Sequence, residues 1–237
     1  HFEDNYSQHD GNDDGFQDEP QVRQYNLQNR WYWKSGGYML HAGVGFLKED
    51  RTSGQTTHTH HLAVGNSPYR INIGTNRYEA YMKHAFILDP THGTNIALMG
   101  NMSIHEQKTN YGIKHYDVNE KNAYASLMFE TNIAEVHNLS AGLSLNHDYL
   151  RQNLMLTSSS AIPSDYGNLY PLINNVESET TPGAYIQYTY NLHNRFIAMA
   201  GLRIDHSSVY GTFVTPRFHV KWMTTDFITL RLSAGKG

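Results

Sequence analysis

The chain has 237 residues, a formal net charge of −4, no cysteine and 17% charged residues. Without cysteine it has neither a disulfide framework nor a Cys-ligated metal site, and its intermingled acidic and basic residues argue against a general nucleic-acid binder. It holds no apolar run of about 18 residues, so the sequence predicts no transmembrane helix. Because it begins at His1 and shows no signal peptide, we expect a piece of a longer protein.

Residues 1–20 are acidic, polar and rich in turn-forming residues, and they end at Pro20. This composition predicts a loop, because such segments cannot bury enough apolar surface to form packed structure. The residue pattern changes at Gln21, where aromatic and aliphatic residues begin to alternate with polar ones. We therefore place the boundary between an acidic loop, 1–20, and a β-rich region, 21–237.

The β-rich region alternates apolar and polar residues with a period of two, which indicates strands with one apolar and one polar face. The clearest case runs from Leu139 to Asn146, where leucine and alanine alternate with serine, glycine and asparagine. The pattern predicts ten strands, at 22–34, 37–49, 70–88, 96–104, 118–133, 139–146, 184–190, 196–205, 214–222 and 228–235.

The connections between these strands alternate in length. Tight turns are expected near residues 35, 91, 136, 193 and 225, and longer loops at 51–69, 109–117, 152–181 and 207–212. In an antiparallel meander all tight turns then fall at one end, and all long loops at the other. Outer-membrane barrels show this asymmetry, with the long loops extracellular. Strands of about 11–14 residues also suffice for a tilted crossing of the hydrocarbon layer.

The alternating faces alone fit a soluble sandwich as well as a barrel, and the connections decide between them. The polar faces hold glycine, serine, asparagine, glutamine, arginine and histidine rather than the dense lysine and glutamate of a water-exposed sheet. The prediction is an all-β, antiparallel, up-and-down transmembrane β-barrel. Its lipid-facing side is expected to include Leu139, Ala141, Leu143, Leu145, Leu202, Ile204, Phe218, Val220, Leu230 and Leu232.

One segment is similar to a known family. The run Thr215-Pro216-Arg217, followed by LRLSAGKG, resembles the middle of the barrel of TonB-dependent outer-membrane receptors. The resemblance implies that about ten strands of a 22-stranded barrel are present, in the outer membrane of a Gram-negative bacterium. It also implies four partners: outer-membrane lipid, the plug domain of the same polypeptide, the TonB system and a surface-exposed lipoprotein. Nucleic acid is not expected among them.

Two sets of side chains have alternative interpretations. Arg203, Arg217, Lys221 and Arg231 share the lumen-facing parity, where they either attract an anionic substrate or pair with plug carboxylates; we expect the second. The histidines of the TTHTHH run (His58, His60 and His61) either ligate a transition metal or heme, or belong to a solvated loop. No cysteine, nucleophile elbow or HExxH pattern organises the fifteen histidines, so we expect no enzyme.

The acidic loop carries a candidate calcium site. The run from Asp10 to Asp18 matches D-x-[DN]-x-[DN]-G-x-x-D, the front of an EF-hand-type loop, in which oxygens at alternate positions converge on the ion. The expected ligands are Asp10, Asn12, Asp14, the Phe16 carbonyl and Asp18. Gln21 stands where the bidentate glutamate belongs, which predicts weak binding of about 10⁻⁴–10⁻³ M. The alternative is an ordinary acidic loop.

Three functions follow from these patterns. The first is active import of a scarce nutrient, such as an iron chelate, heme or cobalamin, through a plugged barrel. The second is a passive outer-membrane porin, which would lack the plug. The third is a soluble all-β ligand-binding module, which would not need detergent during purification. We expect the first, with the transported substrate set by parts of the protein outside this sequence.

Overall fold

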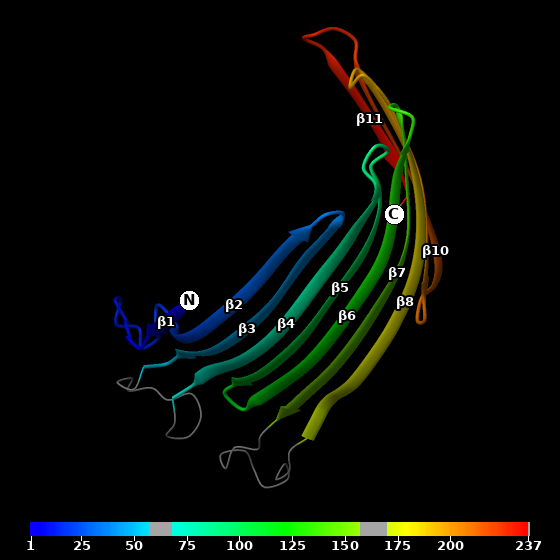
Figure 1. Cartoon of the computed structure of the whole chain (residues 1–237). Coiled ribbons are helices and arrows are strands. Elements are labelled where there is room, and N and C mark those ends of the chain that lie inside the picture. Colours follow the sequence, from blue (N-terminus) through cyan, green and yellow to red (C-terminus); the bar gives the residue numbers. More distant parts are fainter. Residues whose placement is uncertain (57–67, 157–169, 237) are drawn as a thin grey trace.

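The computed structural model describes residues 1–56, 68–156 and 170–236. Within them, eleven strands form one antiparallel sheet in which every strand pairs with its neighbour in the chain (Figure 1). None of the described residues is helical, and no helix long and apolar enough to cross a membrane is found among them. The predicted fold class, an all-β up-and-down meander, is confirmed.

The strands are β1 (Phe2–Asn5), β2 (Gln21–Ser35), β3 (Tyr38–Gly54), β4 (Arg70–Asp89), β5 (Thr94–Tyr111), β6 (Lys114–Ile133), β7 (His137–Leu156), β8 (Tyr170–Leu192), β9 (Phe196–Ser207), β10 (Gly211–Met223) and β11 (Thr229–Gly235). The sequence predicts ten of them. It missed β1, whose four residues pair with β2 inside the segment 1–20 that we expected to be loop throughout. A strand this short has no apolar alternation to reveal it.

Several strands are longer than predicted, and the loops between them are shorter. The loop expected at 109–117 reduces to Gly112 and Ile113, between the paired residues Tyr111 and Lys114. Likewise, β7 extends to Leu156, inside the loop expected at 152–181. The prediction ended each strand where apolar alternation stopped. The backbone hydrogen bonds continue beyond that point because strand pairing needs no apolar side chain.

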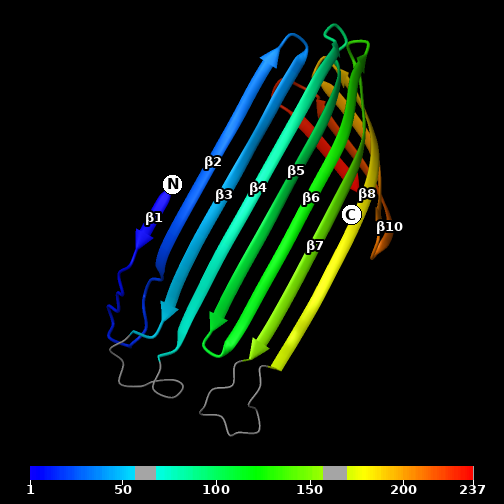
Figure 2. The ribbon, with the colours of Figure 1, turned by 60° about the horizontal axis from the view of Figure 1, so that its bottom comes forward.

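The five tight turns that the sequence predicts lie together at one end of the sheet (Figure 2). The two-residue turn at Gly112 and Ile113 lies at the opposite end, where a longer loop was expected. The first of the five, between Ser35 and Tyr38, contains Gly36 with a φ of 55°, a backbone conformation that glycine adopts without steric cost. Strand register carries each face across the whole sheet, because directly paired residues point to the same side. The register confirms that Leu143, Leu145, Leu202, Ile204 and the other predicted lipid-facing residues share one face.

The sheet is curved (Figure 1). Side chains on the inner side of a curved sheet converge and cover one another, whereas those on the outer side spread apart. The buried residues Ala97, Thr109 and Ser126 all belong to the polar face. On the opposite face, Leu143 is 59% exposed and Leu232 is 63% exposed. The apolar face is therefore convex.

The described residues form no hydrophobic core of the ordinary kind. Ala97 is the one buried hydrophobic residue among those described. A single-layer sheet has no second layer against which an apolar face could pack, so these side chains remain uncovered in the isolated chain. An apolar face of this size needs an apolar medium.

Two groups of aromatic side chains bound the apolar face. Near the tight turns, Tyr38 contacts Phe86 with ring centroids 5.0 Å apart, and toward the other end Phe46 contacts Tyr78 at 5.2 Å. We call these the lower and upper girdles; Tyr149 belongs to the upper one by register. Tyr38 and Phe46 are separated by roughly 26 Å of strand. This is the scale of the apolar band, ~25 Å tall, of outer-membrane barrels.

The assignment of the faces predicts how arginine is tolerated. We expect Leu143→Arg to destabilise the complete barrel by ~2–4 kcal/mol, because the charge enters hydrocarbon near the midplane. Asn101→Arg, on the exposed part of the concave face, is the matched control and should cost less than ~1 kcal/mol. Denaturant unfolding in lipid vesicles measures both. Equal costs would show that the faces are wrongly assigned.

Candidate functional site

The concave face carries a cluster of polar side chains on β6–β9. Asp148 and Glu179 oppose each other directly across β7 and β8. The Asn122 and Asn146 side-chain amides donate hydrogen bonds to Asp148, and the Ser207 hydroxyl donates one of 2.5 Å to Glu179. We call these five residues the acidic cluster. They come from four strands, and only the register of the sheet brings them together.

The acidic cluster is suited to receive a cation. Two carboxylates placed directly opposite each other repel, which destabilises the strand pair. Amide and hydroxyl donors offset part of this cost through hydrogen bonds to charged acceptors, each worth about 1.5–3 kcal/mol. They do not neutralise the two charges. An arginine, a lysine or a cationic group of a ligand on the concave side would complete the electrostatic balance.

Arg203 has a partner that the sequence analysis did not name. Its guanidinium makes two 2.7 Å hydrogen bonds to the carboxylate of Asp205, and a third of 3.0 Å to the hydroxyl of Ser144. The charge of Arg203 is thus matched, within the described part of the chain, by a carboxylate of its own strand. Its pairing with a plug or a substrate stays a prediction. The signal was present in the sequence, since residues two apart on a strand share a face.

The other three predicted cations lie together on β10 and β11. Lys221 and Arg231 oppose each other directly, and Arg217 lies on the same face, four residues before Lys221. None of the three forms an ion pair with any residue that the structure describes. The concave face is therefore divided into an acidic part on β6–β9 and a basic part on β10–β11. Both parts call for charged groups from outside this segment of sheet.

A hollow of about 400 Å³ opens on the concave face over β3–β6. Its lining includes His41, Tyr81, Lys83, Met99, Asn101 and Tyr124. Sequence analysis missed it because these residues occupy the polar parity of four different strands, where no run of letters marks them. Its aromatic walls and its lysine suit an anionic or hydrogen-bonding group.

An ion pair lies on the concave face beyond the upper girdle. The Arg51 guanidinium donates to Glu49 with a shortest Nε–Oε1 distance of 2.5 Å, and the Gln24 amide also donates to Glu49 at 2.5 Å. The hydrogen bond from Arg51 lowers the pKa of Glu49 below its ordinary value. Hydrogen bonds to the charged form favour it, and here they outweigh the opposing effect of partial burial.

The structure shows how the predicted calcium loop is folded. The Asp10 carboxylate accepts hydrogen bonds from the amides of Asp14 (3.2 Å) and Gly15 (2.9 Å), while Asp18 accepts one from Gly11 (2.7 Å). Asp14 accepts one from Phe16 (2.8 Å), and the Asn12 amide donates one of 3.0 Å to Asp14. The predicted ligands thus hydrogen-bond within the loop.

Metal binding is not established by this arrangement. No group of three or more histidine, aspartate or glutamate side chains is placed to hold a metal ion anywhere in the described part of the chain. Calcium binding at Asp10–Asp18 therefore stays a prediction. His58, His60 and His61 lie outside the described residues.

Comparison with known families identifies the chain. The family described as "TonB dependent receptor-like, beta-barrel" matches residues 1–237. The chain belongs to this family. TonB-dependent receptor barrels lie in the outer membrane of Gram-negative bacteria, which explains the convex apolar face of this one. A search of curated protein sequences found no match.

Solved structures of other receptors share the fold. The siderophore receptor PirA from Pseudomonas aeruginosa is 12% identical with a TM-score of 0.60; the match covers 91% of this chain and 33% of PirA. A mutant of the ferric enterobactin receptor PfeA, from the same organism, is 13% identical with a TM-score of 0.61, and the match covers 92% of this chain and 33% of PfeA. The RagAB peptide importer is 10% identical with a TM-score of 0.59, and the match covers 91% of this chain and 33% of the importer chain. The chain thus spans about a third of the length of these receptors.

The ion pair predicts a pH dependence. Glu49→Gln should lower the stability of the receptor barrel near pH 7 by up to ~1 kcal/mol, the range of partly exposed ion pairs. Because the pKa of Glu49 is lowered by folding, its contribution is complete above the unfolded pKa and disappears as pH falls through the folded pKa. The gap between wild type and variant should therefore shrink as the pH falls below the unfolded pKa of glutamate, about 4.3. Unfolding at pH 7 and pH 3 measures it, with Glu19→Gln as the control; a gap that widens in acid contradicts the assignment.

The acidic loop predicts weak calcium binding. Calorimetric titration of the complete receptor should give a dissociation constant of about 10⁻⁴–10⁻³ M. Asp10→Ala and Asp14→Ala should abolish the calcium-dependent heat, because each removes a carboxylate ligand. Asp13→Asn is the matched control, since Asp13 is not a predicted ligand and asparagine tolerates its positive φ of 56°. If no calcium-dependent heat is observed, or if neither alanine substitution changes it, the segment is an ordinary acidic loop that does not bind calcium.

Proposed function

We propose that this chain forms part of the barrel wall of an outer-membrane active transporter that imports a scarce nutrient. The observation that carries the proposal is the division of one sheet into two faces. Its convex face is apolar between two aromatic girdles, and its concave face holds separate acidic and basic parts. Such a wall separates lipid from a polar lumen.

The distribution of charge favours a plugged transporter over an open porin. Asp148 opposes Glu179, and Lys221 opposes Arg231. Each like-charged pair costs stability unless a group of opposite charge lies beside it. A folded plug domain inside the barrel would supply such groups at fixed positions. The proposed partners are therefore the plug domain of the same polypeptide and, through it, the TonB system, with a surface lipoprotein as a further partner.

The proposed substrates are compounds too large for passive diffusion, such as an iron chelate, heme or cobalamin. Membership of the TonB-dependent receptor family supports active import. Two receptors that share the fold are described as receptors for a siderophore and for ferric enterobactin, and a third as a peptide importer. The concave hollow at Tyr81, Lys83 and Tyr124 provides an anion-compatible surface on the proposed route.

Uptake measurements in cells test the proposal. The complete receptor is expressed in a strain that lacks its own receptors, and uptake of labelled ferric chelates, heme and cobalamin is compared with TonB present and deleted. We expect uptake of one of these compounds only when TonB is present. Uptake that persists without TonB would establish a porin instead. Purification without detergent would establish a soluble module.

The acidic cluster gives a residue-level prediction. Asp148→Asn combined with Glu179→Gln should lower TonB-dependent uptake at least about fivefold, because a charged hydrogen bond is worth about 1.5–3 kcal/mol to the contact with the plug. The barrel itself should stay folded, since removing two like charges relieves repulsion. The control is Ser103→Ala, in the same row of the concave face. Unchanged uptake would show that the cluster contacts neither plug nor substrate.

A further inference from the structure

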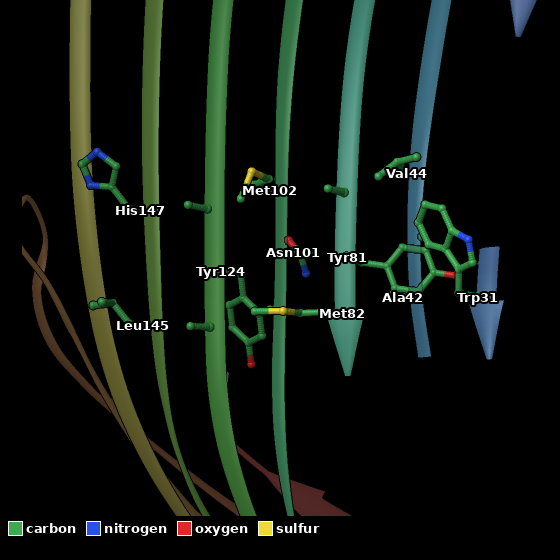
Figure 3. Close-up of a pocket in the computed structure, with 15 residues that line it drawn as sticks. Trp31, Ala42, Val44, Tyr81, Met82, Asn101, Met102, Tyr124, Leu145 and His147 are labelled. Carbon is green, nitrogen blue, oxygen red and sulfur yellow. The ribbon is translucent and has the colours of Figure 1, made fainter. Parts of the chain in front are cut away.

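The convex face has a hollow just inside the upper girdle. It has a volume of about 410 Å³, within the range of roughly 300–1,000 Å³ that is usual for ligand sites. Its floor consists of small residues on β4–β6, namely Ala80, Gly100, Ala123 and Ala125. Larger side chains surround this floor: Trp31, Val44, Met82, Met102, Leu145 and His147 (Figure 3).

The register shows that this hollow opens toward the membrane rather than the lumen. Ala80 pairs with Met102, Met102 with Ala123, and Ala125 with Leu145, so all belong to the convex apolar face. At the neighbouring level of the same face, Leu98 pairs with Leu127, so two large side chains stand where the hollow has Gly100 and Ala125. An unfilled apolar hollow loses dispersion contacts along its lining. Something apolar and flexible enough to enter it would restore them.

The rim of the hollow carries two cations at the membrane boundary. Lys121 lies two residues from Ala123 along β6, with its amino group 5.7 Å from the centre of the Tyr149 ring. Arg151 lies two residues beyond Tyr149 on β7, so the two cations are diagonal neighbours, roughly 7–8 Å apart at the backbone. Neither Lys121 nor Arg151 forms an ion pair with a described residue.

The carboxylates at this rim do not neutralise its cations. Asn119 of β6 is paired with Glu106 of β5 on one side and with Arg151 of β7 on the other. Glu106 accepts a hydrogen bond of 3.1 Å from the Asn119 amide. A second carboxylate of this face, Asp117, lies directly opposite a third cation, Lys108. With these two balanced, Glu106 remains against Lys121 and Arg151, and the rim keeps a net positive charge. Two exposed like charges at this spacing are unfavourable together unless an anion lies between them.

We propose that this surface binds a phosphorylated, multiply acylated glycolipid of the outer leaflet, of the lipid A class. A phosphate lies between Lys121 and Arg151, where both can donate charge-assisted hydrogen bonds. One acyl chain occupies the hollow above Ala123 and Gly100. The upper girdle is at the end of the sheet opposite the tight turns, which is the extracellular side of such barrels. A protein helix would fill the hollow, but it would not explain cations at the level of the lipid headgroups.

Lipid binding by the purified receptor tests the proposal independently of transport. The complete receptor, stripped of lipid in detergent, is titrated with lipid A and examined by native mass spectrometry. Lys121→Gln combined with Arg151→Gln removes the headgroup contacts, and Ala123→Leu fills the hollow. We expect each variant to weaken lipid A binding at least about tenfold. Lipid A without its phosphates should bind wild type as weakly as lipid A binds the charge variant.

Matched controls separate these effects from general damage to the barrel. Lys221→Gln with Arg231→Gln makes the same charge change on the concave face, and Ala200→Leu adds the same bulk to the convex face outside the hollow. Both should bind lipid A like wild type. Heat-modifiable migration in detergent gels shows whether each barrel is folded. If Ala123→Leu does not fold, Ala80→Leu fills the hollow from β4, on the other side of β5.

Three results would overturn the proposal. The first is lipid A binding that neither the charge variant nor the filled variant reduces. The second is equal binding of phosphatidylglycerol in nanodiscs, which would indicate unspecific attraction of anionic lipid. The third is a dimer of the receptor that the filled variant converts to monomers, which would make the hollow an interface between two copies.

Discussion

Backbone hydrogen bonding between neighbouring strands is the interaction on which the rest of this structure depends. Hydrocarbon offers no water to pair with an N–H or C=O group, so a chain that crosses it in strands must satisfy each group from the strand beside it. Every strand described here pairs with its neighbours in chain order. A single layer satisfies this constraint but provides no partner for a hydrophobic core. The apolar side chains therefore gather on one face, and membrane lipid takes the place of a second layer.

The same register that satisfies the backbone also assembles the chemistry. Asp148 faces Glu179, and Lys221 faces Arg231, because antiparallel pairing places them opposite each other. Both like-charged pairs lie on the concave side, where the proposed plug domain would balance them. The rim cations Lys121 and Arg151 lie on the convex side, at the boundary of the apolar band. The concave face of the sheet is thus suited to a polar partner, and its convex face is suited to lipid.

The sequence predicted the faces well and the ends of the strands poorly. Leucines such as Leu143 alternate with small polar residues, and a period of two is the direct consequence of the strand backbone. The extent of each strand depends on pairing instead, so the expected loop at 109–117 proved to be a two-residue turn. β1 was missed for the same reason, since its four residues are held by pairing with β2. Arg203 was assigned to an outside partner although Asp205 shares its face.

The sequence by itself determined the class of the protein: ten of its strands, the parity of their faces, the five tight turns at one end and the family that the Thr215-Pro216-Arg217 segment resembles. These properties are local, because each depends on residues close together in the chain. Only the tertiary structure decided which residues meet across strands. The acidic cluster, the concave hollow and the lipid-facing hollow each combine side chains from three or more strands. A shift of one residue in register would move every one of those side chains to the opposite face, and no short stretch of sequence fixes that register.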